Sequence, residues 1–158
     1  MRLPLLIPAA VVLLAGCTAD KRAEPAQPAP TRTACGSTVE TGPLPEWARA
    51  GFSDDSSMPH VMGDRGSIVA AIFGFPLTAA RSDGTANKIL WVSKPASADP
   101  EAAGELVIDA RLDGSDVSAR RSVPGGPGPS IIDLPQSGCW RLTLTWWGRT
   151  DTMDLTYR

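Results

Sequence analysis

Histidine is almost absent from this chain, and cysteine is scarce. The 158 residues include one histidine, His60, and three cysteines. A nucleophilic triad needs a histidine base beside a serine or thiol. The sequence also lacks G-x-S-x-G, H-E-x-x-H, phosphate-loop and G-x-G-x-x-G motifs. We therefore expect a protein that is not an enzyme.

Long hydrophobic runs are also missing. A membrane-spanning helix needs about 20 apolar residues, whereas the run from Leu3 to Leu14 has twelve, two of them proline, and follows the positive charge of Arg2. A short apolar segment behind a basic residue is typical of a signal peptide.

The apolar run ends in the tetrapeptide Leu14-Ala15-Gly16-Cys17. It resembles the lipobox of bacterial lipoproteins, whose cysteine receives a diacylglyceryl group and becomes the first residue after cleavage. The resemblance implies a signal peptide over residues 1–16 and an acylated Cys17 that inserts into membrane lipid. The implied location is the extracytoplasmic face of the cell membrane. Two or more acyl chains would make this anchoring stable.

A strong charge of either sign is absent. Residues 1–16 hold one of the fifteen basic residues and none of the seventeen acidic ones, so the mature chain carries about −3. A nucleic-acid binder needs a basic stripe, and we expect no nucleic-acid partner.

The two remaining cysteines form an even set in an exported chain. Cys35 and Cys139 are therefore expected to form a disulfide, with free thiols or metal ligation as the alternative. Residues 18–34 hold no large apolar side chain and are rich in Ala, Pro and charge. They predict a lipid-anchored tether over 17–34 and one folded domain over 35–158.

The domain has the periodicity of β-strands. Residues 67–75 are apolar on both alternating faces, as in a strand covered on two sides. Residues 106–112 alternate between apolar and polar, and Asp113-Gly114 predicts an antiparallel return over 115–123. Residues 140–147 and 153–158 predict a hairpin around a turn at 148–151. We also expect a first strand near 37–41, a helical turn over 44–50, a loop over 53–66 and a stiff connector over 125–129.

These patterns predict an all-β fold, an immunoglobulin-like β-sandwich of about seven strands with a short N-terminal helical turn and one disulfide. Trp91, between the two cysteines, repeats the Cys…Trp…Cys order of such domains.

One segment has the chemistry of a metal site. If residues 58–62 are extended, Met58, His60 and Met62 share a face and present two thioethers and an imidazole. This donor set suits copper(I), and Asp64 could orient the imidazole. Ordinary packing of these side chains is the alternative, and it would leave the protein with no cofactor.

Trp147 is the second candidate. The strand pattern places it on the polar face with Arg141, where it could stack on a sugar ring or a partner side chain. Coverage by the Pro/Gly loop at 124–129 is the other interpretation.

The runs NKILW (87–91) and GPSIIDLPQSGCWRLTLTW (128–146) are similar to uncharacterised secreted or lipid-anchored proteins of actinobacteria. The resemblance implies export and a β-sandwich, without a known activity. We expect a binding or structural module of the cell envelope, with an envelope protein or cell-wall polymer as its partner. The alternatives are a copper-trafficking lipoprotein and an accessory subunit of a transporter or signalling complex.

Overall fold

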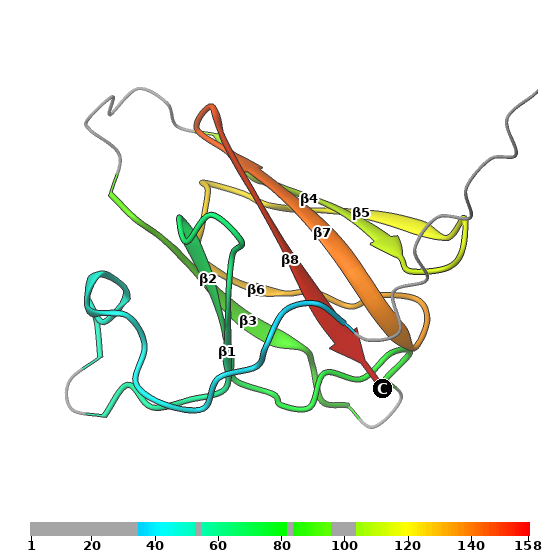
Figure 1. Ribbon diagram of the computed structural model, residues 1–158, viewed down its shortest axis with the longest axis horizontal. Coiled ribbons are helices and arrows are strands. Elements are labelled where there is room, and N and C mark those ends of the chain that lie inside the picture. The colour runs from blue at the N-terminus through cyan, green and yellow to red at the C-terminus, as the bar shows by residue number, and fades with distance from the viewer. Residues whose placement is uncertain (1–34, 53–54, 82–83, 96–103) are drawn as a thin grey trace, which may run out of the picture.

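The computed structural model describes residues 35–52, 55–81, 84–95 and 104–158. Within these ranges two four-stranded antiparallel sheets pack face to face (Figure 1). The first sheet has the order β1-β2-β3-β6 and the second β5-β4-β7-β8. In chain order the strands are β1 (His60–Met62), β2 (Ile68–Ile72), β3 (Lys88–Ser93), β4 (Leu106–Leu112), β5 (Ser118–Val123), β6 (Pro129–Ile131), β7 (Gly138–Trp146) and β8 (Arg149–Tyr157). The predicted all-β sandwich is confirmed.

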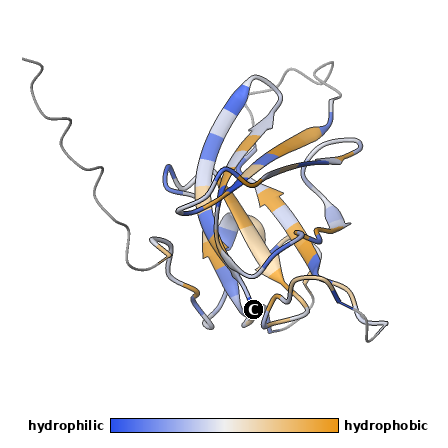
Figure 2. Ribbon diagram, turned by 90° about the vertical axis from the view of Figure 1, so that its right-hand side faces the viewer, coloured by the Kyte–Doolittle hydropathy of each residue, from blue (hydrophilic) through white to orange (hydrophobic). Residues whose placement is uncertain are grey.

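The main core lies between the sheets. Along β4 every second residue, from Leu106 to Leu112, is buried, while Asp109 and Arg111 face away from the core. The same alternation in β7 buries Trp140 and Trp146. Figure 2 shows this change between hydrophobic and hydrophilic residues along the strands. Period-two patterning therefore fixes which face of each strand is internal.

The first sheet is covered on its outer face as well. All five residues of β2 are buried, because Val69 and Ala71 pack away from the main core into a second apolar cluster. Leu44 and Ala48 complete that cluster from the segment around the 3-10 turn η1 (Glu46–Ala48), and Trp47 and Phe52 pack against it. The predicted helical turn and the two-sided burial of this strand are both confirmed.

The predicted disulfide is confirmed. Cys35 and Cys139 are joined across 104 residues, with their Cα atoms 5.3 Å apart. Cys139 is the second residue of β7 and points away from the core, because its neighbour Trp140 points inward. The bond therefore fixes the start of the domain to the outer face of the second sheet.

Several predicted boundaries are wrong. No regular strand forms at 37–41, where Glu40 makes only an isolated bridge to His60. The reason is that this segment bonds to β8 through side chains: Gly36 N donates to Asp154 Oδ2, and Asp154 N donates to Ser37 Oγ.

Two short strands were expected to be irregular. β1 lies within the predicted loop over 53–66, and β6 begins at the end of the predicted connector. Each has three residues. β1 lies between Pro59 and Gly63, and β6 follows Gly128. Three residues are too few to show a period of two, so both strands were missed.

Candidate ligand-binding face

The outer face of the second sheet contains a hollow of about 420 Å³. We call it the arginine hollow. Its lining residues come from β4, β5 and β7: Asp109, Ala110, Arg111, Ser118, Ala119, Arg120, Arg141 and Thr143. Three guanidinium groups, one carboxylate and two hydroxyls therefore border one concave surface.

Strand register produces this arrangement. In one row across the sheet, Ser118 pairs with Arg111, and Arg111 pairs with Arg141. In the next outward row, Arg120 pairs with Asp109, and Asp109 pairs with Thr143. Because directly opposite residues on one face lie about 5 Å apart at Cβ, these side chains converge.

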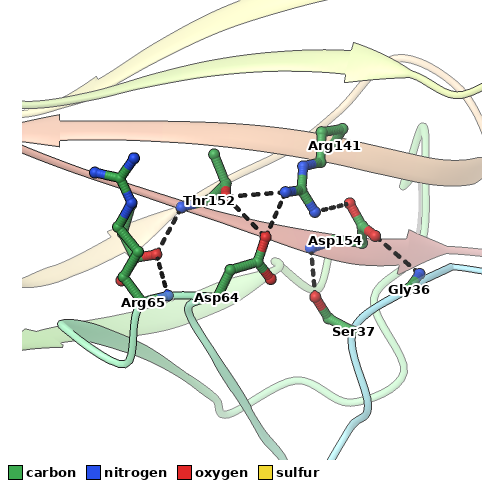
Figure 3. A network of polar contacts seen from close by, with 8 residues as sticks. Gly36, Ser37, Asp64, Arg65, Arg141, Thr152 and Asp154 are labelled. Atoms are coloured by element: carbon green, nitrogen blue, oxygen red, sulfur yellow. Dashed lines mark hydrogen bonds and ion pairs between the residues drawn. The ribbon is translucent and has the colours of Figure 1, made fainter.

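Arg141 is held by a polar network with β8 and the loop before β2 (Figure 3). Its Nη1 donates to Asp154 Oδ1 at 3.0 Å, and its Nη2 donates to Asp64 Oδ2 and to Thr152 Oγ1. Burial lowers the pKa of Arg141, but hydrogen bonds and charge from Asp154 and Asp64 outweigh burial and leave it raised. Arg141 is therefore a fixed and compensated charge.

Arg111 lies beside Arg141 and is not compensated. Its side chain is exposed, and within the part of the chain that the structure describes it has no hydrogen-bond or ion-pair partner. Arg120, by contrast, lies 3.5 Å from Asp109, and both of these side chains are mostly exposed. Like charges on directly opposite residues destabilise a sheet. Asp154 and Asp64 already offset the charge of Arg141, so the feature that an anionic group could use is the guanidinium of Arg111 itself.

Asp151 lies on β8 in the core register, outside the lining of the hollow. It is fully buried, accepts bonds from Arg65 N and Thr152 N through Oδ1, and accepts bonds from Ser67 N and Oγ through Oδ2. Burial acts to raise its pKa, but these bonds outweigh burial and lower it. The carboxylate thus ties β8 to the loop between β1 and β2.

Sequence reasoning missed Asp151 and Asp154. Asp151 is in phase with Met153, Leu155 and Tyr157, all of which are buried. A carboxylate in a core register was the available signal, because such a group is buried only when it is hydrogen-bonded. Asp154 gave no comparable signal, since its cover comes from the distant residues Gly36 and Ser37.

The predicted place of Trp147 is wrong. β7 ends at Trp146, and the hairpin turn is Trp147-Gly148 rather than 148–151. Both turn residues have positive φ, 45° and 70°, as a type I′ turn requires. Trp147 is therefore half-buried at the hairpin tip, six residues from Arg141, and the predicted face shared by these two residues does not form.

The Pro/Gly loop at 124–129 covers this indole, which is the alternative that the sequence left open. A Cβ atom on Gly126 would lie 2.7 Å from Trp147 Cζ2, so the loop backbone rests directly on the ring. The indole Nε1 is buried without a hydrogen-bond partner in the described ranges. Trp147 packs against the main core.

The structure brings Met58, His60 and Met62 to the outer face of the first sheet. The two methionines pack against the second apolar cluster. His60 is buried, with Nδ1 2.9 Å from Met58 O and Nε2 3.4 Å from Glu40 Oε2. The expectation that Asp64 orients the imidazole is wrong. Asp64 binds Arg141 and Thr152 instead.

Other metal donors are not gathered nearby. Within the described ranges no group of three or more His, Cys, Asp or Glu side chains could hold a metal ion. Copper(I) at residues 58–62 would therefore need both thioethers in addition to His60.

Comparison with known proteins adds little. No protein-family model and no curated protein matches the chain. The fold is similar to a solved Bacillus anthracis protein described as a "putative lipoprotein", with 21% identity and a TM-score of 0.44 over 76% of this chain and 88% of that one. The expected actinobacterial relationship stays a prediction.

The remaining candidate, Cys17, lies outside the described residues, as do the signal peptide expected over 1–16 and the tether expected over 17–34. In the ranges that are described, no helix is long and apolar enough to cross a bilayer.

Proposed function

We propose that the protein is a lipid-anchored, extracytoplasmic binding module of the bacterial cell envelope. The pairing of its cysteines carries this proposal. Because Cys35 and Cys139 bond to each other, Cys17 is the cysteine left over, and it stands at the end of a lipobox-like tetrapeptide. A disulfide between distant residues also fits an oxidising compartment.

Mass spectrometry of protein purified from bacterial membranes tests the anchor. We expect a chain that begins at Cys17 and carries a diacylglyceryl group. The variant C17S should keep residues 1–16 and should lack lipid. A wild-type chain that is uncleaved and unacylated would contradict the anchor.

The arginine hollow supports binding rather than catalysis. It presents the guanidinium of Arg111, which has no partner among the described residues, beside the Thr143 hydroxyl and the fixed guanidinium of Arg141. Guanidinium groups bind carboxylates and phosphates through paired hydrogen bonds. The class of ligand that fits is an anionic cell-envelope polymer.

Calorimetry with polygalacturonate and with polyphosphate tests this ligand class, with neutral dextran as the reference polymer. We expect R111A to weaken binding about tenfold, because one charge-assisted bond is worth about 1.5–3 kcal/mol. T145A, an exposed position on the same sheet outside the hollow, is the matched control. Equal affinity for dextran, or unchanged binding by R111A, would exclude the hollow as an anion site.

A second candidate function is copper(I) binding. It is favoured by the placement of Met58, His60 and Met62 on one sheet face, with His60 Nε2 directed at the exposed Glu40. Copper(I) titration against a chromophoric chelator tests it. We expect H60A to lose the affinity and E40A to retain it; affinity that survives in H60A would remove this site.

A further inference from the structure

Large hydrophobic side chains are exposed at three places in the described residues. Phe73 is 49% exposed, Phe75 is 47% exposed and Ile131 is 59% exposed. Phe73 and Phe75 follow the end of β2, and Ile131 is the last residue of β6. All three therefore belong to one end of the first sheet. We call them, together with Lys88, the apolar end patch.

Strand register brings three of these residues side by side. Phe73 N donates to Lys88 O, and Lys88 is paired with Ile131 in the ladder between β3 and β6. Ile89 and Ile132 are buried in the main core, so Lys88 and Ile131 point outward. A hollow of about 440 Å³ lies beside them, lined by Lys88, Pro129, Ser130 and Ile131.

The patch combines aromatic and aliphatic groups with a cation. Lys88 Nζ lies 5.3 Å from the centre of the Phe73 ring. Aromatic and aliphatic side chains enter the boundary between lipid headgroups and acyl chains, while lysine keeps its ammonium group among the headgroups. Anionic lipids attract such a lysine further.

The chain enters the domain at the same end of the sandwich. Cys35 is bonded to Cys139 at the start of β7. Tyr157 Oη at the end of β8 donates to Ile132 O, and Arg158 N donates to Leu77 O. Figure 1 shows the C-terminus and the loop after β2 at this end. Seventeen residues separate Cys17 from Cys35, and a chain of this length spans at most about 60 Å, so this end of the domain is within reach of the bilayer.

The patch is small for a protein partner. About half of three large side chains gives roughly 300 Å², whereas a stable complex buries about 800 Å² on each partner. A domain that is already tethered needs far less, because the anchor raises its local concentration at the membrane.

We propose that the apolar end patch rests on the surface of the membrane that holds the acylated cysteine. This proposal rests on the lipid anchor proposed above. It orients the domain, so that the opposite end of the sandwich, with the hairpin tip at Trp147-Gly148, points away from the lipid.

Tryptophan quenching by brominated lipids tests the orientation. Full-length protein from bacterial membranes is reconstituted into vesicles of phosphatidylglycerol and phosphatidylethanolamine with bromines on the acyl chains. We expect F73W and I131W to lose about half of the emission that the new indole adds to wild type. T145W, with its indole near the opposite end of β7, is the matched control and should lose none.

The outcomes separate the patch from the anchor. If wild type floats with the vesicles and C17S does not, the anchor holds; equal quenching in F73W, I131W and T145W would then overturn the patch alone. If wild type carries no lipid, the proposed anchor fails. F73W coupled through the Cys17 thiol to a maleimide lipid in the same vesicles then tests the patch directly, because the tether is restored, and unquenched emission overturns it. A concentration-dependent dimer that forms without vesicles and is lost in F73D would also overturn it.

Discussion

The two outer faces of the sandwich differ in what lies on them. The outer face of the first sheet, the covered face, is apolar and lies beneath the segment around η1. The outer face of the second sheet, the open face, carries charged and hydroxyl side chains that border a hollow. Each face belongs to a sheet of four antiparallel strands. The residue types at the outward positions of the strands, together with the segment around η1, therefore determine which face is covered and which is open.

The difference shows where this fold buries apolar side chains and where it leaves polar side chains accessible. Val69 and Ala71 on the covered face contribute a second core, which a body of about 120 residues needs because it buries only about two-thirds of its unfolded surface. The open face contributes little apolar burial. Its residues can therefore serve a ligand at small cost to folding.

Reduction of the disulfide should have the largest effect on this comparison. Cys35 fixes the start of the covering segment to β7. Closure of a loop of about 104 residues stabilises by up to about 4–5 kcal/mol in the chain-entropy model. We expect the urea midpoint to fall steeply in C35S/C139S or on reduction, with C17S as the control. An unchanged midpoint would show that packing alone holds the cover.

A charge on each face should give the next largest contrast. Val69 is fully buried, so V69D should cost about 3 kcal/mol or more through an unpaired buried carboxylate. T145D, on the open face, should stay within about 0.5 kcal/mol of wild type. Urea unfolding measures both variants. Similar losses would mean that the two faces do not differ in cover.

Much of the sandwich could be predicted from sequence, because its longer strands are periodic. β4 and β7 alternate over seven residues each, Leu106–Leu112 and 140–146, which is long enough for the period to be clear. The two apolar faces of β2 correctly predicted a cover. The segment at 37–41 and the turn at Trp147 could not be predicted in this way, since side-chain bonds to Asp154 and a tryptophan at positive φ override local preference.

The candidate site was predicted only in part. Arg141 was identified on a polar strand face, and it does line the hollow. Arg111 and Ser118 were not assigned to it, because the register that places β4 between β5 and β7 is a non-local property. Asp64 was assigned to His60, its neighbour in sequence, whereas its partner Arg141 lies 77 residues away.

Asp151 gives a smaller effect with a defined pH dependence. Its folded pKa is lowered, so its contribution to stability is present above the unfolded value of about 3.9 and is lost as pH falls through the folded value. D151N should cost about 1–3 kcal/mol at pH 7, because the amide cannot accept all four bonds. The variant should also show a shallower loss of stability below pH 4 than wild type.

Urea unfolding at pH 7 and at pH 3 measures this difference, with D113N at an exposed turn as the control. If D151N and wild type lost equal stability between these two pH values, the buried carboxylate would not be the group responsible.

Removal of Arg111 should give the smallest change in stability, and its sign should differ from that of Arg141. Arg111 has a cationic neighbour and no described partner, so R111A should be neutral or stabilising by a few tenths of a kcal/mol, more at low salt. R141A should cost about 1–3 kcal/mol, because it removes the cation beside the buried Asp154. Denaturation at low and high salt measures both. If removal of the Arg111 side chain stabilises the fold, Arg111 does not contribute to folding. If R111A instead destabilised the domain as much as R141A, the hollow would be structural, and the anion-binding proposal would lose its central residue.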